Sequence, residues 1–207
     1  MALNHAPTPP AKRALKLRAA ARVIRRHFPP HLPSFLFLTD PVRIPTPEAA
    51  IMALPRQCGI VFRHFGDETE IDFIREFSPV LHREGRIFLI AADPDLALET
   101  SATGVHWPEN RLRFARKWRD KFQLQTASAH SARAIRAAAS EGMNAALLSP
   151  VFPSNSPSAG RPLGPARFRA LAQRTDLPVY GLGGLNIRNF SRIGSSAGIA
   201  AIDGLII

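Results

Sequence analysis

Short apolar runs alternate with amphipathic stretches from residue 34 onward. Each run is four residues long, and the stretches between runs carry apolar residues at helical spacing. This alternation predicts repeated strand–helix units and a parallel sheet. Eight runs occur, at residues 35–38, 59–62, 87–90, 103–106, 122–125, 145–148, 179–182 and 199–202. Eight parallel strands indicate an α/β fold of the small (β/α)8 barrel type (TIM barrel), with an open doubly wound sheet as the alternative.

Helices are expected between the strands and at the N-terminus. The intervening segments with helical spacing are residues 71–82, 111–119, 132–141, 165–174 and 187–193. The given sequence stops directly after the eighth run, and we expect the eighth outer helix to be absent. A helix over about residues 12–28 offers a replacement, because Leu17, Ile24 and Phe28 form an apolar stripe along it. We expect this stripe to pack between the last strand and the first.

The composition is that of a globular protein. Of 207 residues, 45% are hydrophobic and 21% are charged, which excludes a disordered, collagen-like or coiled-coil chain. No apolar run approaches the roughly 18 residues of a membrane-spanning helix, and we expect a cytoplasmic protein. Cys58 is the only cysteine. Internal disulfides and cysteine-based zinc clusters are therefore excluded.

The positive charge is concentrated at the N-terminus. The chain has 27 Lys and Arg against 16 Asp and Glu, and residues 1–33 hold seven of those bases and no acid. We therefore divide the chain into a basic arm with one amphipathic helix, residues 1–33, and a barrel, residues 34–207. The basic face of the arm is interpreted first as solvated, with nucleic-acid binding, anionic membranes or an organellar address as alternatives. The barrel needs no nucleic acid as partner, and a homo-oligomer stays open.

Polar residues and glycines follow the apolar runs, at the strand ends where such barrels carry their chemistry. Thr39 follows the first run and Arg63 the second, while residues 128–130 follow the fifth. Gly183 and Gly184 follow the seventh. Adjacent glycines let main-chain N–H groups approach an anion closely, and these barrels often bind phosphate between strands seven and eight.

Several motifs resemble those of the thiamine phosphate synthase and thiazole tautomerase (TenI) family. Residues 128–131 read Ser-Ala-His-Ser, like the family's strand-five signature. Residues 149–154 read Ser-Pro-Val-Phe-Pro-Ser, and residues 162–164 read Pro-Leu-Gly. Residues 181–185 and 198–202 resemble the last two strands. The resemblance spans about residues 35–207, and the motifs keep the order and spacing of the family.

The resemblance implies a ligand and the residues that hold it. The ligand would be a small molecule, a thiazole phosphate from thiamine assembly. Its phosphate would lie on the main chain after strands seven and eight, at Gly183, Gly184, Asp203 and Gly204. Further substrate contacts would come from Thr39, Arg63, Ser128, Ser154 and Ser156.

The residues that would hold magnesium and pyrophosphate in the synthase are largely replaced. The strand-three Asn-Asp pair falls on Ala91 and Ala92, and the strand-four aspartate falls on Arg111. Alanine offers no side-chain oxygen to a hard cation. As an alternative, Asp93 or Asp95 restores one carboxylate, or an arginine contacts the phosphate directly. Asp203 is a further departure, because an inward carboxylate repels an anion. Its side chain should face away, or the phosphate site is weakened.

His130 is the candidate catalytic residue. In the tautomerase branch the matching histidine moves a proton on the thiazole, and an imidazole suits this role near neutral pH. We therefore favour metal-independent proton transfer, with no cofactor and no metal ligands. One alternative is an atypical thiamine phosphate synthase using Mg²⁺ and an aminopyrimidine pyrophosphate. The other is a non-catalytic thiazole-phosphate-binding module.

Overall fold

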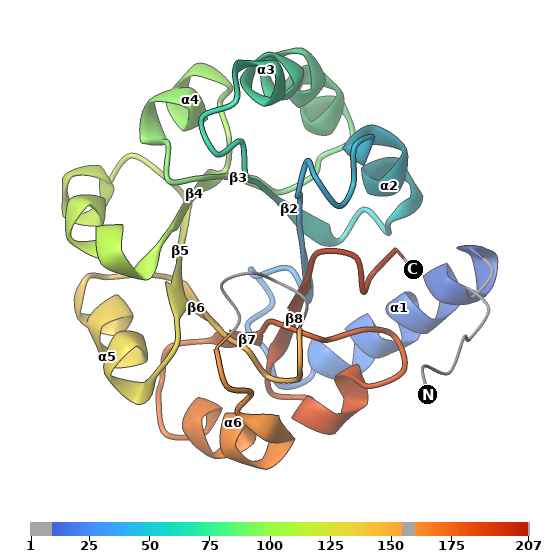
Figure 1. The fold of residues 1–207 in the computed structure, drawn as a ribbon, viewed down its shortest axis with the longest axis vertical. Helices are drawn as coiled ribbons and strands as arrows, with labels where there is room; N and C mark the ends of the chain where they lie inside the picture. The colour runs from blue at the N-terminus through green and yellow to red at the C-terminus, as the bar shows by residue number, and fades with distance from the viewer. Residues whose placement is uncertain (1–9, 155–159, 207) are drawn as a thin grey trace.

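Eight parallel strands close into a barrel. The computed structural model describes residues 10–154 and 160–206. The strands follow one another in sequence order, and the first pairs with both the second and the eighth (Figure 1). They are β1 (Phe35–Leu38), β2 (Cys58–Phe62), β3 (Phe88–Ala91), β4 (Gly104–Trp107), β5 (Leu124–Ala129), β6 (Ala145–Leu148), β7 (Val179–Gly181) and β8 (Gly198–Ala201). The predicted (β/α)8 class is confirmed, and the open sheet was the wrong alternative.

Helices surround the barrel on its outside (Figure 1). They are α1 (Pro10–Ile24), α2 (Pro47–Ala53), α3 (Glu68–Arg83), α4 (Pro94–Glu99), the 3-10 helix η1 (Glu109–Trp118), α5 (Ala132–Ser140), α6 (Gly164–Ala172) and the 3-10 helix η2 (Phe190–Ile193). Two of the predicted helices, at residues 111–119 and 187–193, are thus 3-10 segments. The sequence pattern missed α2 and α4, because seven and six residues are too few to show a helical period.

The core fills the barrel and the layer between strands and helices. Every residue of β6 is buried, as is every residue of β2. A strand covered by helices outside and by neighbouring side chains inside is apolar on both faces. The runs are therefore continuous rather than alternating. No helix among the described residues is long and apolar enough to span a membrane.

Helix α1 lies beside β8, where the strand–helix order leaves a gap (Figure 1). Leu17, Ile24 and Phe28 are each no more than 3% exposed, as the apolar stripe predicts. The ring of Phe28 meets Tyr180 of β7 edge to face, with ring centroids 5.0 Å apart. The Arg13 guanidinium donates to the Ile206 carbonyl. The first described helix thus holds the last strand in place, while the division of the chain at residue 33 stays a prediction.

Candidate functional site

The loops after β7 and β8 form a cleft of about 540 Å³. We call it the β7–β8 cleft. Gly183 and Gly184 contribute one wall, Asp203 and Gly204 contribute another, and Arg43 reaches in from the loop after β1. The sequence predicted that these two glycine-containing segments lie together, and the structure brings them into one cavity. This arrangement follows from the parallel barrel, in which adjacent strands end at the same rim.

The glycines in this cleft are required by the backbone. Gly183 and Gly184 have φ of +92° and +63°, in the region that L side chains rarely adopt. A Cβ at Gly184 would lie 2.3 Å from the Pro153 carbonyl oxygen, and one at Gly204 would lie 1.8 Å from that of Leu185. Any side chain at these positions would force the two loops apart. The glycines therefore keep the main chain exposed to whatever fills the cleft.

Four main-chain N–H groups of the cleft lack an acceptor. They belong to Gly183, Gly184, Asp203 and Gly204, and none of them donates a hydrogen bond within residues 10–154 and 160–206. A buried N–H group without an acceptor costs free energy, and Gly204 is buried while the other three residues are partly buried. Several such donors around one cavity carry partial positive charge and suit an anion.

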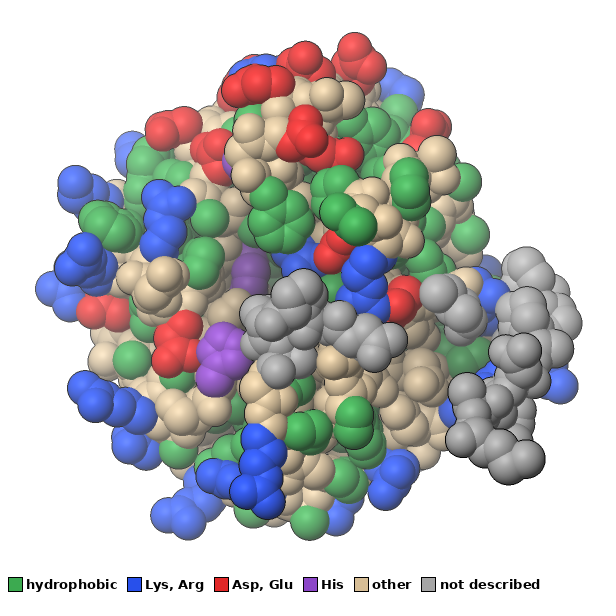
Figure 2. Space-filling model, viewed as in Figure 1, with side chains coloured by type: hydrophobic (Ala, Val, Ile, Leu, Met, Phe, Trp, Pro, Cys, Tyr) green, Lys and Arg blue, Asp and Glu red, His purple; other side chains and the backbone are tan. Residues whose placement is uncertain are grey.

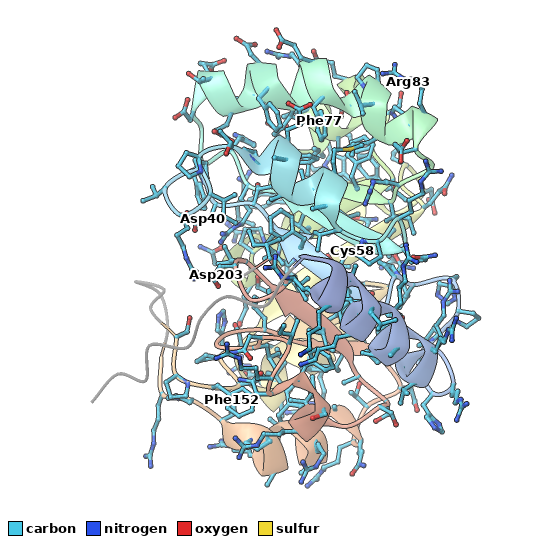
Figure 3. All side chains as sticks on the ribbon, turned by 90° about the vertical axis from the view of Figure 1, so that its right-hand side faces the viewer. Asp40, Cys58, Phe77, Arg83, Phe152 and Asp203 are labelled. Carbon is cyan, nitrogen blue, oxygen red and sulfur yellow. The ribbon has the colours of Figure 1, made fainter. Side chains whose placement is uncertain are left out.

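Asp203 does not turn away from the cleft. Its carboxylate lines the cavity and forms an ion pair with the Arg43 guanidinium. Asp40 and Asp203 lie at the same end of the barrel, where β1 and β8 end (Figure 3). The repulsion expected of an inward carboxylate is thus offset by an arginine that the sequence argument did not single out. Arg188 also lines the cleft, so the side chains of the cavity carry a net positive charge.

A second cleft, of about 820 Å³, opens at the ends of β2, β3 and β4. We call it the β2–β4 cleft. Its basic lining includes Arg63, Arg111 and Lys117. Arg63 is held in place because its Nε donates to the Thr39 carbonyl at 2.7 Å and its Nη2 to Asp40 at 3.0 Å. Burial lowers the pKa of Arg63 from its usual value, and the Asp40 carboxylate works in the opposite direction.

A buried hydrogen-bond chain lies under this second cleft. The ring of His106 contacts the Thr126 hydroxyl through Nδ1 at 2.9 Å and the Ser128 hydroxyl through Nε2 at 3.0 Å. Ser128 also lines the cleft. Burial, together with the charge of Arg63, lowers the pKa of His106 to about 4. The imidazole is therefore neutral at pH 7, and it fixes the hydroxyl of Ser128 toward the cavity floor.

Asp93, a carboxylate near β3, is already engaged by its neighbours. Asp93 caps α4, since its Oδ1 accepts from the Leu96 N–H at 2.9 Å, and its Oδ2 lies 3.5 Å from the His64 ring. Arg111 donates to the Ala92 carbonyl at 3.2 Å, which brings a positive charge to the same place. No group of three or more His, Cys, Asp or Glu side chains that could hold a metal occurs in the described parts of the chain. Magnesium is commonly held by one or two carboxylates together with substrate phosphates, and here a guanidinium stands beside the carboxylate that offers itself.

His130 lies at the rim rather than in either cleft. Its side chain is 52% exposed, and Nδ1 lies 2.7 Å from Glu109 Oε2 of η1. The same carboxylate oxygen accepts from the His130 main-chain N–H at 3.0 Å. The residues that line the two described clefts do not include His130. The Glu109 carboxylate fixes the orientation of the His130 ring through Nδ1, and Nε2 takes no part in this contact.

The remaining residues expected in the site are distributed as follows. Thr39 is buried, and its hydroxyl accepts from the Arg63 N–H at 3.0 Å, so it supports Arg63. Ser154 lines the β7–β8 cleft. Ser156 lies outside the described residues. The sequence did not indicate Arg43 or Glu109 as site residues. Each lies far along the chain from its partner, Asp203 or His130, so no local motif could reveal the contact.

The closed barrel of eight parallel strands, with glycine loops after β7 and β8, places this chain in the class of (β/α)8 barrel proteins. The sequence profile of the thiamine monophosphate synthase family matches residues 48–205 of this chain. The chain therefore belongs to the thiamine monophosphate synthase family. This finding confirms the family that the motifs predicted.

Known relatives support the same assignment. A thiamine-phosphate synthase of Prochlorococcus marinus is 25% identical over 149 residues, which is 70% of this chain and 42% of that protein. One from Bacillus mycoides is 30% identical over 133 residues, covering 61% of this chain and 59% of that protein. The chain thus spans about half the length of these relatives. The solved structure of a thiamine phosphate pyrophosphorylase from Pyrococcus furiosus superposes with a TM-score of 0.65 at 18% identity, over 81% of this chain and 84% of that one.

Proposed function

We propose that this protein binds a thiazole phosphate, with the phosphate in the β7–β8 cleft. The observation that carries the proposal is the set of four main-chain N–H groups that find no acceptor among the described residues. A phosphate oxygen would accept from them, as it does at glycine loops in other barrels. Arg188 and the Arg43–Asp203 pair leave the cleft with positive charge for the anion. Membership of the thiamine monophosphate synthase family supports the thiazole as the organic part.

Calorimetric titration with thiazole phosphate tests this binding. Gly184→Ala would place a Cβ against the Pro153 carbonyl and displace the donors, so we expect at least about tenfold weaker binding. Gly160→Ala is the matched control, because no atom lies within 4 Å of the added Cβ. Circular dichroism checks that both variants fold. Equal affinity of the two variants would refute the β7–β8 cleft as the phosphate site.

For the reaction, the proposal is proton transfer by His130 without a metal. The Glu109 carboxylate supports it, because a histidine that donates Nδ1–H to a carboxylate keeps Nε2 free to accept a proton. This role needs the thiazole to extend from the β7–β8 cleft toward η1. The residues near β3 take no part in this step.

Deuterium exchange into the thiazole, followed by proton NMR in D2O, tests the reaction. The wild type should exchange, and His130→Ala should not. Glu109→Gln keeps the shape but removes the charge, so we expect a rate lowered by about 10²-fold or more. Binding should stay unchanged in both variants. Exchange that persists in His130→Ala would exclude this residue, and binding without any exchange would make the protein a non-catalytic thiazole-phosphate-binding module.

The atypical synthase is the second candidate, favoured by the basic lining of the β2–β4 cleft. Arg63, Arg111 and Lys117 would face the pyrophosphate of an aminopyrimidine pyrophosphate directly. Titration of that compound with and without Mg²⁺ distinguishes the two candidates. Tight binding that is lost in Arg111→Gln, followed by release of pyrophosphate once thiazole phosphate is added, would support the synthase. No binding under either condition would exclude it.

A further inference from the structure

Two adjoining cavities lie at the opposite end of the barrel from the candidate site. They have volumes of about 350 Å³ and about 290 Å³, and both are lined by Arg56, Gln57 and Glu84. Arg18 of α1 lines the first and Arg25 lines the second. We call the joined cavities the basal groove. It runs between the N-terminal helix and the segments that enter β1, β2 and β3.

The basal groove is remote from the clefts at the strand ends. Its residues precede β1, β2 and β3, whereas the candidate site is built from loops that follow the strands. Figure 3 shows Arg83, next to the segment that enters β3, at the side of the molecule away from Asp40 and Asp203. A ligand in the groove would therefore not touch the β7–β8 cleft.

Arg86 is buried in this groove and forms no ion pair with a carboxylate of residues 10–154 or 160–206. Its side chain lines the larger cavity, and the residue is 6% exposed. Its Nη2 donates to the Leu54 carbonyl at 3.1 Å and its Nη1 to that of Pro55 at 3.3 Å. Its Nε finds no acceptor in the described parts of the chain. Burial lowers the pKa of Arg86 from its usual value, while the Glu84 carboxylate acts in the opposite direction and the charge of Arg56 adds to the lowering.

Glu84, the acidic residue that lines the groove, already forms an ion pair. Glu84 pairs with Arg56 through both oxygens, at 3.0 Å from Nη2 and 2.9 Å from Nε. Arg18 and Arg25 form no ion pair with any described acid, and α1 contains no Asp or Glu. Beyond the Arg56–Glu84 pair, Arg18, Arg25 and Arg86 thus add three positive charges to the groove, and the described residues that line it supply no further acid.

We propose that the basal groove binds an anion with two linked phosphate groups, of the diphosphate class. Guanidinium groups bind phosphate oxygens through paired N–H donors. The unpaired arginines are divided between the two cavities, Arg18 and Arg86 in one and Arg25 in the other. With one phosphate in each cavity, the diphosphate would contact the arginines of both cavities. Arg56, which lines both, would lie between the two phosphates. The bound anion would also fasten α1 to the barrel.

Inorganic pyrophosphate is the probe, used on the full chain at about 150 mM salt so that weak surface attraction is screened. Binding is measured by calorimetry and by the rise of the melting temperature. We expect Arg18→Gln/Arg25→Gln to weaken pyrophosphate binding at least about tenfold and to abolish the rise. Both residues are exposed, Arg18 on α1 and Arg25 in the turn that follows it, and glutamine preserves helix propensity at position 18.

Two controls make the result specific. Arg133→Gln/Arg136→Gln removes the same charge from exposed positions of α5 and should bind pyrophosphate like the wild type. The Gly184→Ala variant should also retain this binding, because its altered cleft lies at the other end. Equal weakening by both arginine pairs would overturn the proposal, as would orthophosphate binding as tightly as pyrophosphate. Loss in Gly184→Ala alone would assign the pyrophosphate to the β7–β8 cleft instead.

Discussion

Acidification from pH 7 to pH 4 should destabilise the protein through His106. The ring is 5% exposed and contacts the hydroxyls of Thr126 and Ser128, and burial holds its pKa at about 4 instead of 6.5. Between these two values the unfolded chain binds a proton that the native protein does not bind. Stability therefore falls as the pH falls through this window. At about 1.4 kcal/mol for each pH unit, the contribution of His106 amounts to about 3 kcal/mol.

Urea unfolding between pH 7 and pH 4 measures this loss. Carboxylates and other histidines titrate in the same range, so the comparison is with His106→Gln, which keeps polar contacts to both hydroxyls but does not titrate. The variant should be less stable at pH 7 and should lose about 3 kcal/mol less than the wild type on acidification. Parallel stability curves for the two proteins would refute the account of His106 as a buried neutral ring.

Three further predictions concern the closure of the barrel and the charge of its rim. Phe28→Ala should lower the free energy of unfolding by about 3 kcal/mol, measured in urea, because the ring is 3% exposed and leaves a cavity beside Tyr180. A loss below about 1 kcal/mol would mean that α1 does not seal the barrel. Tyr180→Phe should cost about 1–3 kcal/mol in the same assay, since its buried hydroxyl donates to the Pro33 carbonyl at 2.6 Å. Asp203→Asn should strengthen binding of inorganic phosphate about tenfold in calorimetry, because it releases Arg43 for the anion; unchanged affinity would show that the pair does not act on the cleft.

Much of the fold follows from the sequence, because strands buried on both faces leave unbroken apolar runs. The runs at residues 35–38 and 145–148 coincide with β1 and β6 residue for residue. The fifth run is placed two residues early, since β5 continues through Thr126 and Ser128. Polar side chains there are stabilised by the His106 ring, a tertiary contact that no local pattern reveals.

The site was predictable only where the backbone dictates the residue. Gly183 and Gly184 have positive φ, so their position after the seventh run was informative. Arg43 follows β1 by five residues and meets Asp203 only because the barrel closes. Glu109 reaches His130 across 21 positions of sequence for the same reason. Partners of this kind depend on the register of the closed sheet, which the apolar pattern does not encode.

The contact between Arg13 and Ile206 joins residues 193 positions apart. During synthesis α1 is made before every strand of the barrel, but the surface that accepts it is completed only when β8 has been made. Native closure must therefore await nearly the whole chain, and contacts of such long sequence separation slow folding. Until then the buried side chains of α1, among them Leu17 and Ile24, lack the surface against which they pack in the finished barrel.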